Sequence, residues 1–452
     1  MTAPLASLGR RPVALASSFL LAVDARDYPL IGNLVARTGQ TLTYARTTNG
    51  SLATLSDGRV ATVLANQPRM SWVDFDGDGA LEAVGRPAVA ATTNLILRSG
   101  DPTHAAWTKT NTTAVASTTV RAPDGTLAVK VFENAVNTTH FLTATGITVA
   151  AGAYGTMSVF IKAAERSRVY FGFENGVNSC YATARLDLGT ISSAVGGTGT
   201  ALDVGLQAFG NGWYRAWVTG RTGAAVTALT CRMFVLDGTG ASSYAGATTN
   251  GVYLWGMDFQ AGDTSGARVL DHIPTTSASV ASGGEALTVA TPGFTCPDTL
   301  TLYARFARPL WGSATAHIGG SAPLVLRWGG NPNGLAIYIE NTGASRTIAG
   351  WVYDGSGVQA VTAVQSMPAA QAVGITPVEV CLQVTATQTA AKCRLDVGSG
   401  FGAYSSTVGT VVPTGAIGLG CDPSGTGNLC TPWQTMRIAT GALTLAQMRD
   451  GY

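Results

Sequence analysis

The stretch Gly155–Asn175, "GTMSVFIKAAERSRVYFGFEN", decides the fold class, because each half of it has the pattern of a β-strand. In the first half, Met157, Val159 and Ile161 occupy alternate positions, which is the period of a strand with one buried face. The second half is rich in aromatic residues, which favour strands. The predicted fold class is therefore all-β. Further segments of this kind occur at 212–220 ("GWYRAWVTG"), 230–238 ("TCRMFVLDG") and 251–262 ("GVYLWGMDFQAG").

The composition agrees with this prediction. Of the 452 residues, 12% are charged, 46% are hydrophobic and 56 are glycine. Helices would need far more Glu, Lys, Leu and Gln on their exposed faces, whereas short strands joined by tight turns accommodate many glycines. The last segment, "ATGALTLAQMRDGY" (439–452), departs from the strand pattern and predicts a short helix with Thr444 as its N-cap.

Three regions of the chain differ in pattern. Residues 1–90 contain short extended pieces, which are interrupted by the turn-forming dipeptides Asn-Gly (49–50) and Asp-Gly (57–58). Residues 91–279 contain longer strands, and a Thr- and Ser-rich linker then leads to a second set of strands in residues 285–452. The length also indicates two or three domains. We predict two β-sandwiches in series after a small N-terminal β region.

One apolar stretch near the N-terminus has two interpretations. Arg10 and Arg11 precede "PVALASSFLLAV" (12–23), an order of charged and apolar residues that is typical of export signals. The favoured alternative is an apolar arm or strand that docks on another part of the molecule. No apolar run approaches the roughly 20 residues that span a bilayer, so membrane insertion is not expected.

Charge and cysteine content exclude further classes. The formal net charge is +2, and Lys and Arg are scattered, so no basic patch for nucleic acid is predicted. The seven cysteines contain no CxxC pair, which leaves zinc ribbons and redox motifs unsupported. Most of them are expected to be small buried thiols. The alternative of a disulfide stays open for Cys421 and Cys430, which flank a glycine-rich loop.

The sequence does not predict an enzyme. The four histidines show neither HxH nor HExxH spacing, and no GxSxG motif occurs. A glycosidase needs two facing carboxylates, and no pair that faces each other follows from the sequence. Glu165, in the turn "KAAERS", is expected to be structural. The carboxylates considered as glycosidase candidates are Glu133, Glu165, Glu174, Asp187 and Glu340.

The segment "WVDFDGDGALE" (72–82) carries a half-complete calcium loop. Asp74, Asp76 and Asp78 alternate ahead of a glycine, as in an EF-hand loop, and Glu82 follows at the ninth position. The bidentate Glu at the twelfth position is missing, and no flanking helices are predicted. The segment is therefore interpreted either as a short calcium site of these four acidic residues or as a turn whose Asp side chains accept backbone N–H groups. No cofactor is required by either interpretation.

Six segments occur in a characteristic order along residues 91–280. They are "ATTNLILRSGDPTHAAWTKTNTT" (91–113), "APDGTLAVKVFEN" (122–134), "GTMSVFIKAAERSRVYFGF" (155–173), "GNGWYRAWVTG" (210–220), "GVYLWGMDFQAG" (251–262) and "HIPTTSASV" (272–280). In this order they resemble a domain of tailed-bacteriophage virion proteins, over residues 91–279, and similarity to the segment that precedes this domain extends back to about Thr41. The C-terminal sandwich, with its ending "GALTLAQMRDGY", is similar to concanavalin-like and laminin-G-like lectin domains.

The resemblance implies a fold, a location on a virion surface, and binding partners. It implies a jelly roll like a carbohydrate-binding module in residues 91–279 and a lectin-like sandwich in residues 285–452. The expected protein is a structural component of a virion surface (tail, fibre or head spike), attached by residues 1–90 to other virion proteins and presenting its sandwiches to a host-surface glycan. A homo-oligomer, such as a trimer, is expected. The alternatives are a purely architectural capsid decoration or head-spike protein, and a secreted bacterial lectin or glycan-active enzyme.

A glycan-binding surface needs exposed aromatic rings with polar groups beside them. Trp311 and Trp433 are expected at an edge or in a loop, whereas Trp328 and Trp351 are assigned to the core. Trp107, Trp213 and Trp255 are assigned to packing in the first sandwich. The predicted carbohydrate-binding residues are Trp311, Trp433, Asn331, Asn333, Tyr353 and Asp354.

Overall fold

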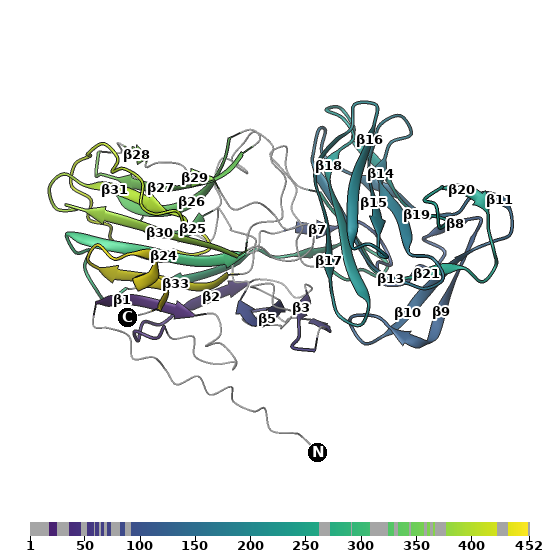
Figure 1. Cartoon of the computed structure of the whole chain (residues 1–452), viewed down its shortest axis with the longest axis horizontal. Helices are drawn as coiled ribbons and strands as arrows, with labels where there is room; N and C mark the ends of the chain where they lie inside the picture. Colours follow the sequence, from purple (N-terminus) through teal and green to yellow (C-terminus); the bar gives the residue numbers. More distant parts are fainter. Residues whose placement is uncertain are drawn as a thin grey trace, which may run out of the picture.

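The chain forms two β-sandwiches that lie side by side (Figure 1). Strand pairs in both are antiparallel, which confirms the all-β prediction. The computed structural model describes residues 18–24, 36–46, 52–57, 59–62, 65–66, 70–73, 82–85, 92–261, 272–290, 292–307, 324–329, 333–342, 345–356, 359–361, 365–366, 377–422 and 433–450.

Residues 92–282 form the first sandwich, called the central sandwich below. A separate ribbon pairs β11 (Asn137–Thr139) with β20 (Ser243–Ala245). The six-stranded sheet has the order β16-β15-β14-β19-β12-β8, with the bounds Thr190–Gly196, Ser179–Arg185, Arg168–Glu174, Ala228–Val235, Phe141–Thr148 and Thr108–Thr110. The eight-stranded sheet has the order β17-β18-β13-β21-β10-β9, with the bounds Thr200–Ala208, Trp213–Arg221, Gly155–Ala163, Gly251–Ala261, Leu127–Glu133 and Thr112–Arg121, and it also includes β7 (Thr92–Asn94) and β22 (Val280–Ser282).

The core of the central sandwich follows the alternation seen in the sequence. Met157, Val159 and Ile161 of β13 are buried in the same cluster as Phe171 and Phe173 of β14. Burial of a side chain of this size contributes roughly 1.5–3 kcal/mol relative to exposure. The stretch that predicts the fold class therefore supplies one strand to each sheet.

The three tryptophans assigned to packing in this sandwich are buried, as predicted. Trp107 belongs to the core between the sheets. Trp213 and Trp255 lie in a second buried cluster with Phe160, which alternates with the core residues of β13. Both faces of β13 are thus covered.

The other sandwich, called the C-terminal sandwich below, has a core that contains Trp328, as predicted. Its seven-stranded sheet has the order β31-β30-β24-β33-β6-β5, with the bounds Lys392–Asp396, Pro377–Thr385, Thr299–Ala307, Trp433–Thr440, Glu82–Gly85 and Met70–Val73, and β1 (Phe19–Asp24) pairs with β33. Its eight-stranded sheet has the order β2-β23-β32-β25-β26-β27-β28, with the bounds Thr43–Arg46, Glu285–Val289, Ile417–Leu419, Leu324–Gly329, Gly334–Thr342, Ser345–Tyr353 and Gln359–Val361, and β29 (Gln365–Ser366) pairs with β27.

The predicted terminal helix is present as α1 (Leu445–Asp450). The Thr444 hydroxyl accepts a hydrogen bond from Gln447 N–H at 3.2 Å, and the Gln447 side chain accepts one from Thr444 N–H at 2.9 Å. These reciprocal bonds form a capping box, which confirms Thr444 as the N-cap. Leu445 and Met448 pack on the outer surface of the seven-stranded sheet. Among the described residues, no helix has the length and apolar character needed to cross a membrane.

The described strands of residues 1–90 do not form a separate β region, which differs from the prediction. β1 pairs with β33 and β2 pairs with β23, so both strands belong to the C-terminal sandwich. β5 and β6 pair with each other, and Gly85 of β6 pairs with Trp433. Of the described strands within residues 1–90, β3 (Leu52–Thr54) and β4 (Val60–Thr62) alone form a ribbon outside both sandwiches. Strand pattern alone cannot assign a strand to a sheet, because every backbone offers the same hydrogen-bonding groups.

The central sandwich is consequently an insertion between strands of the C-terminal sandwich. Its first and last strands, β7 and β22, pair with each other near the junction of the two sandwiches (Figure 1). The buried Asn94 amide donates to Ile273 O at 2.8 Å and accepts from the N–H groups of Ile96 and Phe259 at 3.0 and 3.1 Å. These hydrogen bonds join the first strand of the inserted domain to segments near its C-terminal end.

Candidate functional site

The prediction that Trp433 lies at an exposed edge or loop is wrong. Trp433 begins β33 opposite Phe306 of β24, and its side chain is fully buried in the core of the C-terminal sandwich. An indole in this position stabilises the fold and has no surface for a ligand. The proline before it suggested a loop, but the strand begins directly at the tryptophan.

Two of the predicted carbohydrate-binding residues, Asn333 and Asp354, form hydrogen bonds with backbone groups of the C-terminal sandwich. The Asn333 amide donates to Val412 O at 2.9 Å and accepts from Val412 N–H at 3.1 Å. Asp354 is buried, and its carboxylate accepts from the N–H groups of Ser356 at 3.0 Å and Gly409 at 3.0 Å. These side chains therefore bind the chain's own backbone.

The aromatic side chains next to Asp354 lie on the outer face of the eight-stranded C-terminal sheet. Tyr353 is half-buried, and so is Trp351, which the sequence assigned to the core. Trp351 packs on Tyr338 with ring centroids 3.9 Å apart. The core assignment of Trp351 is wrong, because residue 351 shares its side of β27 with residues 349 and 353, whereas Ile348 and Val352 face the core.

Several predicted residues lie outside the described part of the chain. These are Trp311, Asn331, Asp74, Asp76 and Asp78, while Glu82 is the first residue of β6 and its side chain is not described. Within the described residues, no group of three or more His, Cys, Asp or Glu side chains is arranged to hold a metal ion. The calcium loop stays a prediction.

Four aromatic side chains that the sequence did not single out lie together on the outer surface of the six-stranded sheet. We call this group the aromatic face. Phe141 of β12 is paired with Phe234 of β19, and Phe234 is paired with Tyr170 of β14. Their ring centroids are 4.8 and 5.7 Å apart. Tyr181 of β15 stacks on Tyr170 at 4.5 Å with an interplanar angle of 9°. The rings thus form one continuous row over four strands.

A glycine allows the tyrosines to stack. Gly172 is paired with Tyr181 across β14 and β15. A Cβ atom at Gly172 would lie 2.2 Å from Cys180 O, 2.6 Å from Tyr181 Cα and 2.9 Å from Tyr181 Cδ1. Without that atom, the Tyr181 ring can lean across Gly172 towards Tyr170. The alternation of "RVYFGFE" thereby places Phe171 and Phe173 in the core and Tyr170 on the aromatic face.

Charged side chains border one side of the aromatic face. Arg232 pairs with Glu174 at 2.9 Å, and its guanidinium lies 5.3 Å from the centre of the Phe141 ring. The Tyr181 hydroxyl donates to Glu174 at 3.1 Å. Burial, and secondarily the charge of Glu174, raises the pKa of both Tyr170 and Tyr181. Both phenols therefore stay protonated at neutral pH, and the proton of Tyr181 is the one donated to Glu174.

The aromatic face is suited to non-covalent binding. Phe141, Tyr170 and Phe234 are half-buried, so each ring is supported from below and retains accessible surface. Tyr181 is buried and supports Tyr170. Flat apolar rings bordered by hydrogen-bonding groups match ligands that have both C–H faces and hydroxyl groups. The sequence feature that could have revealed the aromatic face is an outward-facing aromatic residue in each of several strands. This feature predicts a row of rings only when the pairing register of the strands is known.

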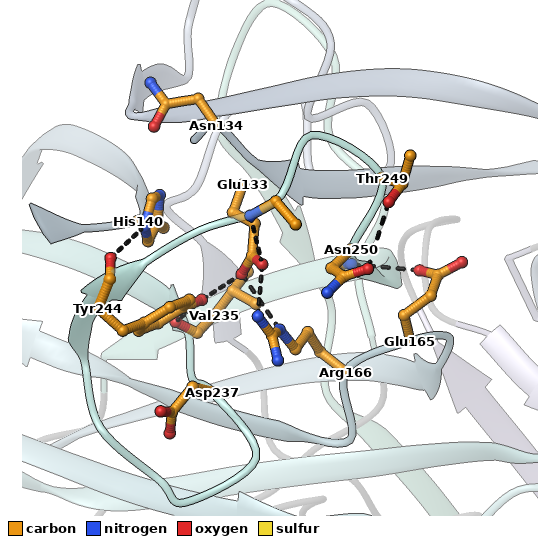
Figure 2. A network of polar contacts seen from close by, with 12 residues as sticks. Glu133, Asn134, His140, Glu165, Arg166, Val235, Asp237, Tyr244, Thr249 and Asn250 are labelled. Atoms are coloured by element: carbon orange, nitrogen blue, oxygen red, sulfur yellow. Dashed lines mark hydrogen bonds and ion pairs between the residues drawn. The ribbon is translucent and has the colours of Figure 1, made fainter. Parts of the chain in front are cut away.

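A polar network at one end of the central sandwich is a second candidate (Figure 2). Glu133, the last residue of β10, is buried, and its carboxylate accepts from Arg166 Nη2 at 2.5 Å and Nε at 3.2 Å. It also accepts from the Tyr244 hydroxyl and, at 3.0 Å, from Ala247 N–H. The two ring nitrogens of His140 lie 2.8 Å from Asn111 O and 3.2 Å from Tyr244 O. The network joins β10, the turn after β13 and the β20 segment.

Glu165, which lies beside the network, does not have the raised pKa of a glycosidase's general acid. Glu133 is held by Arg166 (Figure 2). The neighbouring Glu165 accepts from Lys130 Nζ at 2.8 Å and from Gly251 N–H at 3.2 Å. Burial acts to raise the pKa of Glu165, but the hydrogen bonds from Lys130 and the backbone lower it overall. A general acid in a glycosidase is a carboxyl group with a raised pKa. We assign Glu133 and Glu165 to structure, and the absence of enzyme activity stays a prediction.

The described cysteines are poor nucleophiles. Six of them are buried thiols outside disulfides, and these include Cys421. Burial raises the pKa of Cys180, Cys296 and Cys421 to about 12, so almost no thiolate exists at neutral pH. The prediction of small buried thiols is confirmed for these residues, whereas Cys430 lies outside the described part of the chain.

We expect these thiols to stay unmodified in the folded protein. In a Cys430→Ser variant, a disulfide reagent at pH 8 should label fewer than one thiol per chain before unfolding and six in guanidinium chloride. The measurement is the absorbance of the released thiol, with the denatured sample as its control. Rapid labelling of several thiols in the folded state would contradict the burial.

The fold defines the class of the protein as an antiparallel β-sandwich protein with one sandwich inserted into another. No family model matches the chain. No curated protein matches it either. Among solved structures, it is similar to domains LG4-5 of the mouse laminin alpha1 chain, with 9% identity and a TM-score of 0.22, over 69% of this chain and 90% of that chain. No property of the laminin domains is transferred to this chain at that level of similarity.

Proposed function

We propose that this chain is a structural protein of the surface of a tailed phage or phage-like particle and that it binds a host-surface glycan without chemical reaction. The place on a particle is supported by the resemblance of residues 91–279 to a domain of tailed-phage virion proteins. Other virion proteins and further copies of the chain are the proposed partners. Because β1 and β2 belong to the C-terminal sandwich, we assign attachment to that sandwich and ligand binding to the inserted one.

The aromatic face is the observation that carries glycan binding. Phe141, Phe234 and Tyr170 line up across adjacent strands, so their positions are set by backbone hydrogen bonds instead of by loops. A rigid row of rings loses little conformational entropy when a ligand stacks on it. The bordering side chains Arg232 and Glu174 are held in an ion pair and offer polar contacts to hydroxyl groups.

Replacing a ring of the aromatic face is expected to weaken glycan binding. We expect Tyr170→Leu and Phe234→Leu to lower affinity by at least about tenfold each, because an aromatic hot spot at the centre of a binding surface contributes about 2 kcal/mol or more and tenfold corresponds to about 1.4 kcal/mol. Leucine keeps apolar volume in the sheet, so thermal unfolding should change little. Binding is measured first on an array of bacterial surface glycans and then by calorimetry with the glycans found.

The control is Tyr404→Leu, which removes an exposed ring from the C-terminal sandwich. This variant should bind like the unchanged protein. If the unchanged protein binds no surface glycan, the carbohydrate role is wrong and the architectural alternative is favoured. Immunogold labelling of purified particles tests the virion assignment separately, and the absence of the chain from particles would overturn it.

A further inference from the structure

Two arginines of like charge face each other beside the aromatic face. Arg168 of β14 and Arg185 of β15 are directly paired in the strand register. Arg168 lies two residues before Tyr170, so both side chains point to the same side of the six-stranded sheet. Like charges in directly opposite positions of antiparallel strands destabilise a sheet. The arrangement therefore has a cost in stability.

A single carboxylate accompanies the two arginines. Asp187 Oδ2 lies 3.4 Å from Arg168 Nη2 and 3.2 Å from Arg185 Nη2. Partial burial acts to raise the pKa of Asp187, but the hydrogen bonds from Arg185 and Arg168 lower it, so this carboxylate carries one full negative charge at neutral pH. The ion-paired group thus contains two guanidinium groups and one carboxylate, which is an excess of one positive charge within the group.

Among the described residues, the ion pairs of Arg168 and Arg185 are both with Asp187. Glu174 is committed to Arg232 and to the Tyr181 hydroxyl. Asp237 is ionised as well, but its carboxylate accepts hydrogen bonds from Thr239, Gly240 and Ala241 within its own turn, and its charge adds to the effect of Glu133 in raising the pKa of Arg166. In the part of the chain that the structure describes, Arg185 Nε is buried and has no hydrogen-bond partner. The side chain of Arg185 as a whole is 36% exposed, so a part of it other than Nε is accessible to a ligand.

The spacing matches one sugar unit. Side chains two residues apart on the same face of a strand are separated by about 6.8 Å. A sugar ring stacked on Tyr170 therefore has its substituents within reach of Arg168 and Arg185. Guanidinium groups bind carboxylate, sulfate and phosphate through two parallel hydrogen bonds, which neutral hydroxyl groups cannot match.

We propose that the aromatic face selects an acidic glycan, whose anionic group binds Arg168 and Arg185 while the sugar ring stacks on Tyr170. This inference rests on the proposed glycan-binding function and adds the chemical class of the ligand. The bound anion supplies the negative charge that the arginine pair lacks. Such an anion would offset the repulsion between the two arginines, which lie at directly opposite positions of adjacent strands.

The test compares acidic polysaccharides with the same polysaccharides after chemical reduction of their carboxyl groups. We expect the acidic form to bind at least tenfold more tightly, with an affinity that falls as salt rises. Arg185→Gln and Arg168→Gln should lower the affinity for the acidic form to that for the reduced form. Arg185→Gln should leave the melting temperature unchanged or raise it, because the repulsion is relieved.

The control is Arg121→Gln, which removes one exposed positive charge from β9 of the other sheet and should not alter the preference. Tyr170→Leu should weaken binding of both forms, because it removes the stacking surface. Equal binding of acidic and reduced forms would overturn the acidic preference and leave the glycan-binding function standing. Failure of every polysaccharide to bind would overturn the glycan-binding function itself.

Discussion

A fragment of residues 92–282 is expected to fold on its own, whereas a fragment of residues 285–452 is expected to remain unfolded. The first contains both sheets of the central sandwich and the β7–β22 pair that closes it. The second lacks β1 and β2, which supply neighbours to β33 and β23. Phe19, Leu21 and Val23 of β1 are buried, and the loss of each costs roughly 1.5–3 kcal/mol. Their sum is comparable to the whole stability of a typical domain, about 5–15 kcal/mol.

A direct connection between β2 and β23 is expected to restore folding of the C-terminal sandwich. Arg46 and Glu285 are paired at the ends of these antiparallel strands, so a two-residue Asn-Gly turn can join residues 18–46 to residues 285–452. Circular dichroism and thermal unfolding of the three proteins check the prediction. Cooperative unfolding of 285–452 alone, at the temperature of the joined protein, would show that β1 and β2 are dispensable.

The second large effect is expected from Glu133→Ala in the polar network of Figure 2. The change removes the acceptor for Arg166, the Tyr244 hydroxyl and Ala247 N–H, and it leaves a largely buried guanidinium without its counter-ion. Breaking a buried ion pair by removing one partner costs about 3–5 kcal/mol. For a domain of this size, that corresponds to a melting temperature lower by roughly 10 °C.

The matched control is Glu165→Ala, which removes a carboxylate from the same end of the sandwich. The Glu165 side chain is 45% exposed and its ion pair with Lys130 is open to solvent, so the loss should stay below about 1 kcal/mol. Differential scanning calorimetry of the fragment 92–282 measures both variants in one domain. Equal melting temperatures for the two variants would mean that Glu133 is not the anchor of this network.

Much of the fold was predictable, because strand patterns are local. The alternation of Met157, Val159 and Ile161 predicts their burial, and Thr444 predicts the start of the terminal helix. The pairing of strands that are distant in the sequence, and with it the insertion of one sandwich into the other, was not predictable from local patterns. The apolar stretch that contains β1 showed that it needs a partner, but not that its partner is β33, more than four hundred residues further along the chain.

The candidate site was predicted less well than the fold. Trp433 was expected at the surface because it follows a proline, yet it fills the core. Tyr170 and Phe234 were passed over because each is one of many aromatic residues in strands. They become a candidate site only when the register pairs them on adjacent strands.

The sequence by itself determined that this protein is all-β, where many of its strands lie, and which face is buried where alternation is clear, as for Met157, Val159 and Ile161. Side-chain chemistry and its period of two are properties of each segment alone. Only the tertiary structure decided that one sandwich is inserted into the other, and that an aromatic row lies beside Arg168 and Arg185. Strands are joined by backbone groups that all residues share, so the choice of neighbours is made by the packing of the whole molecule.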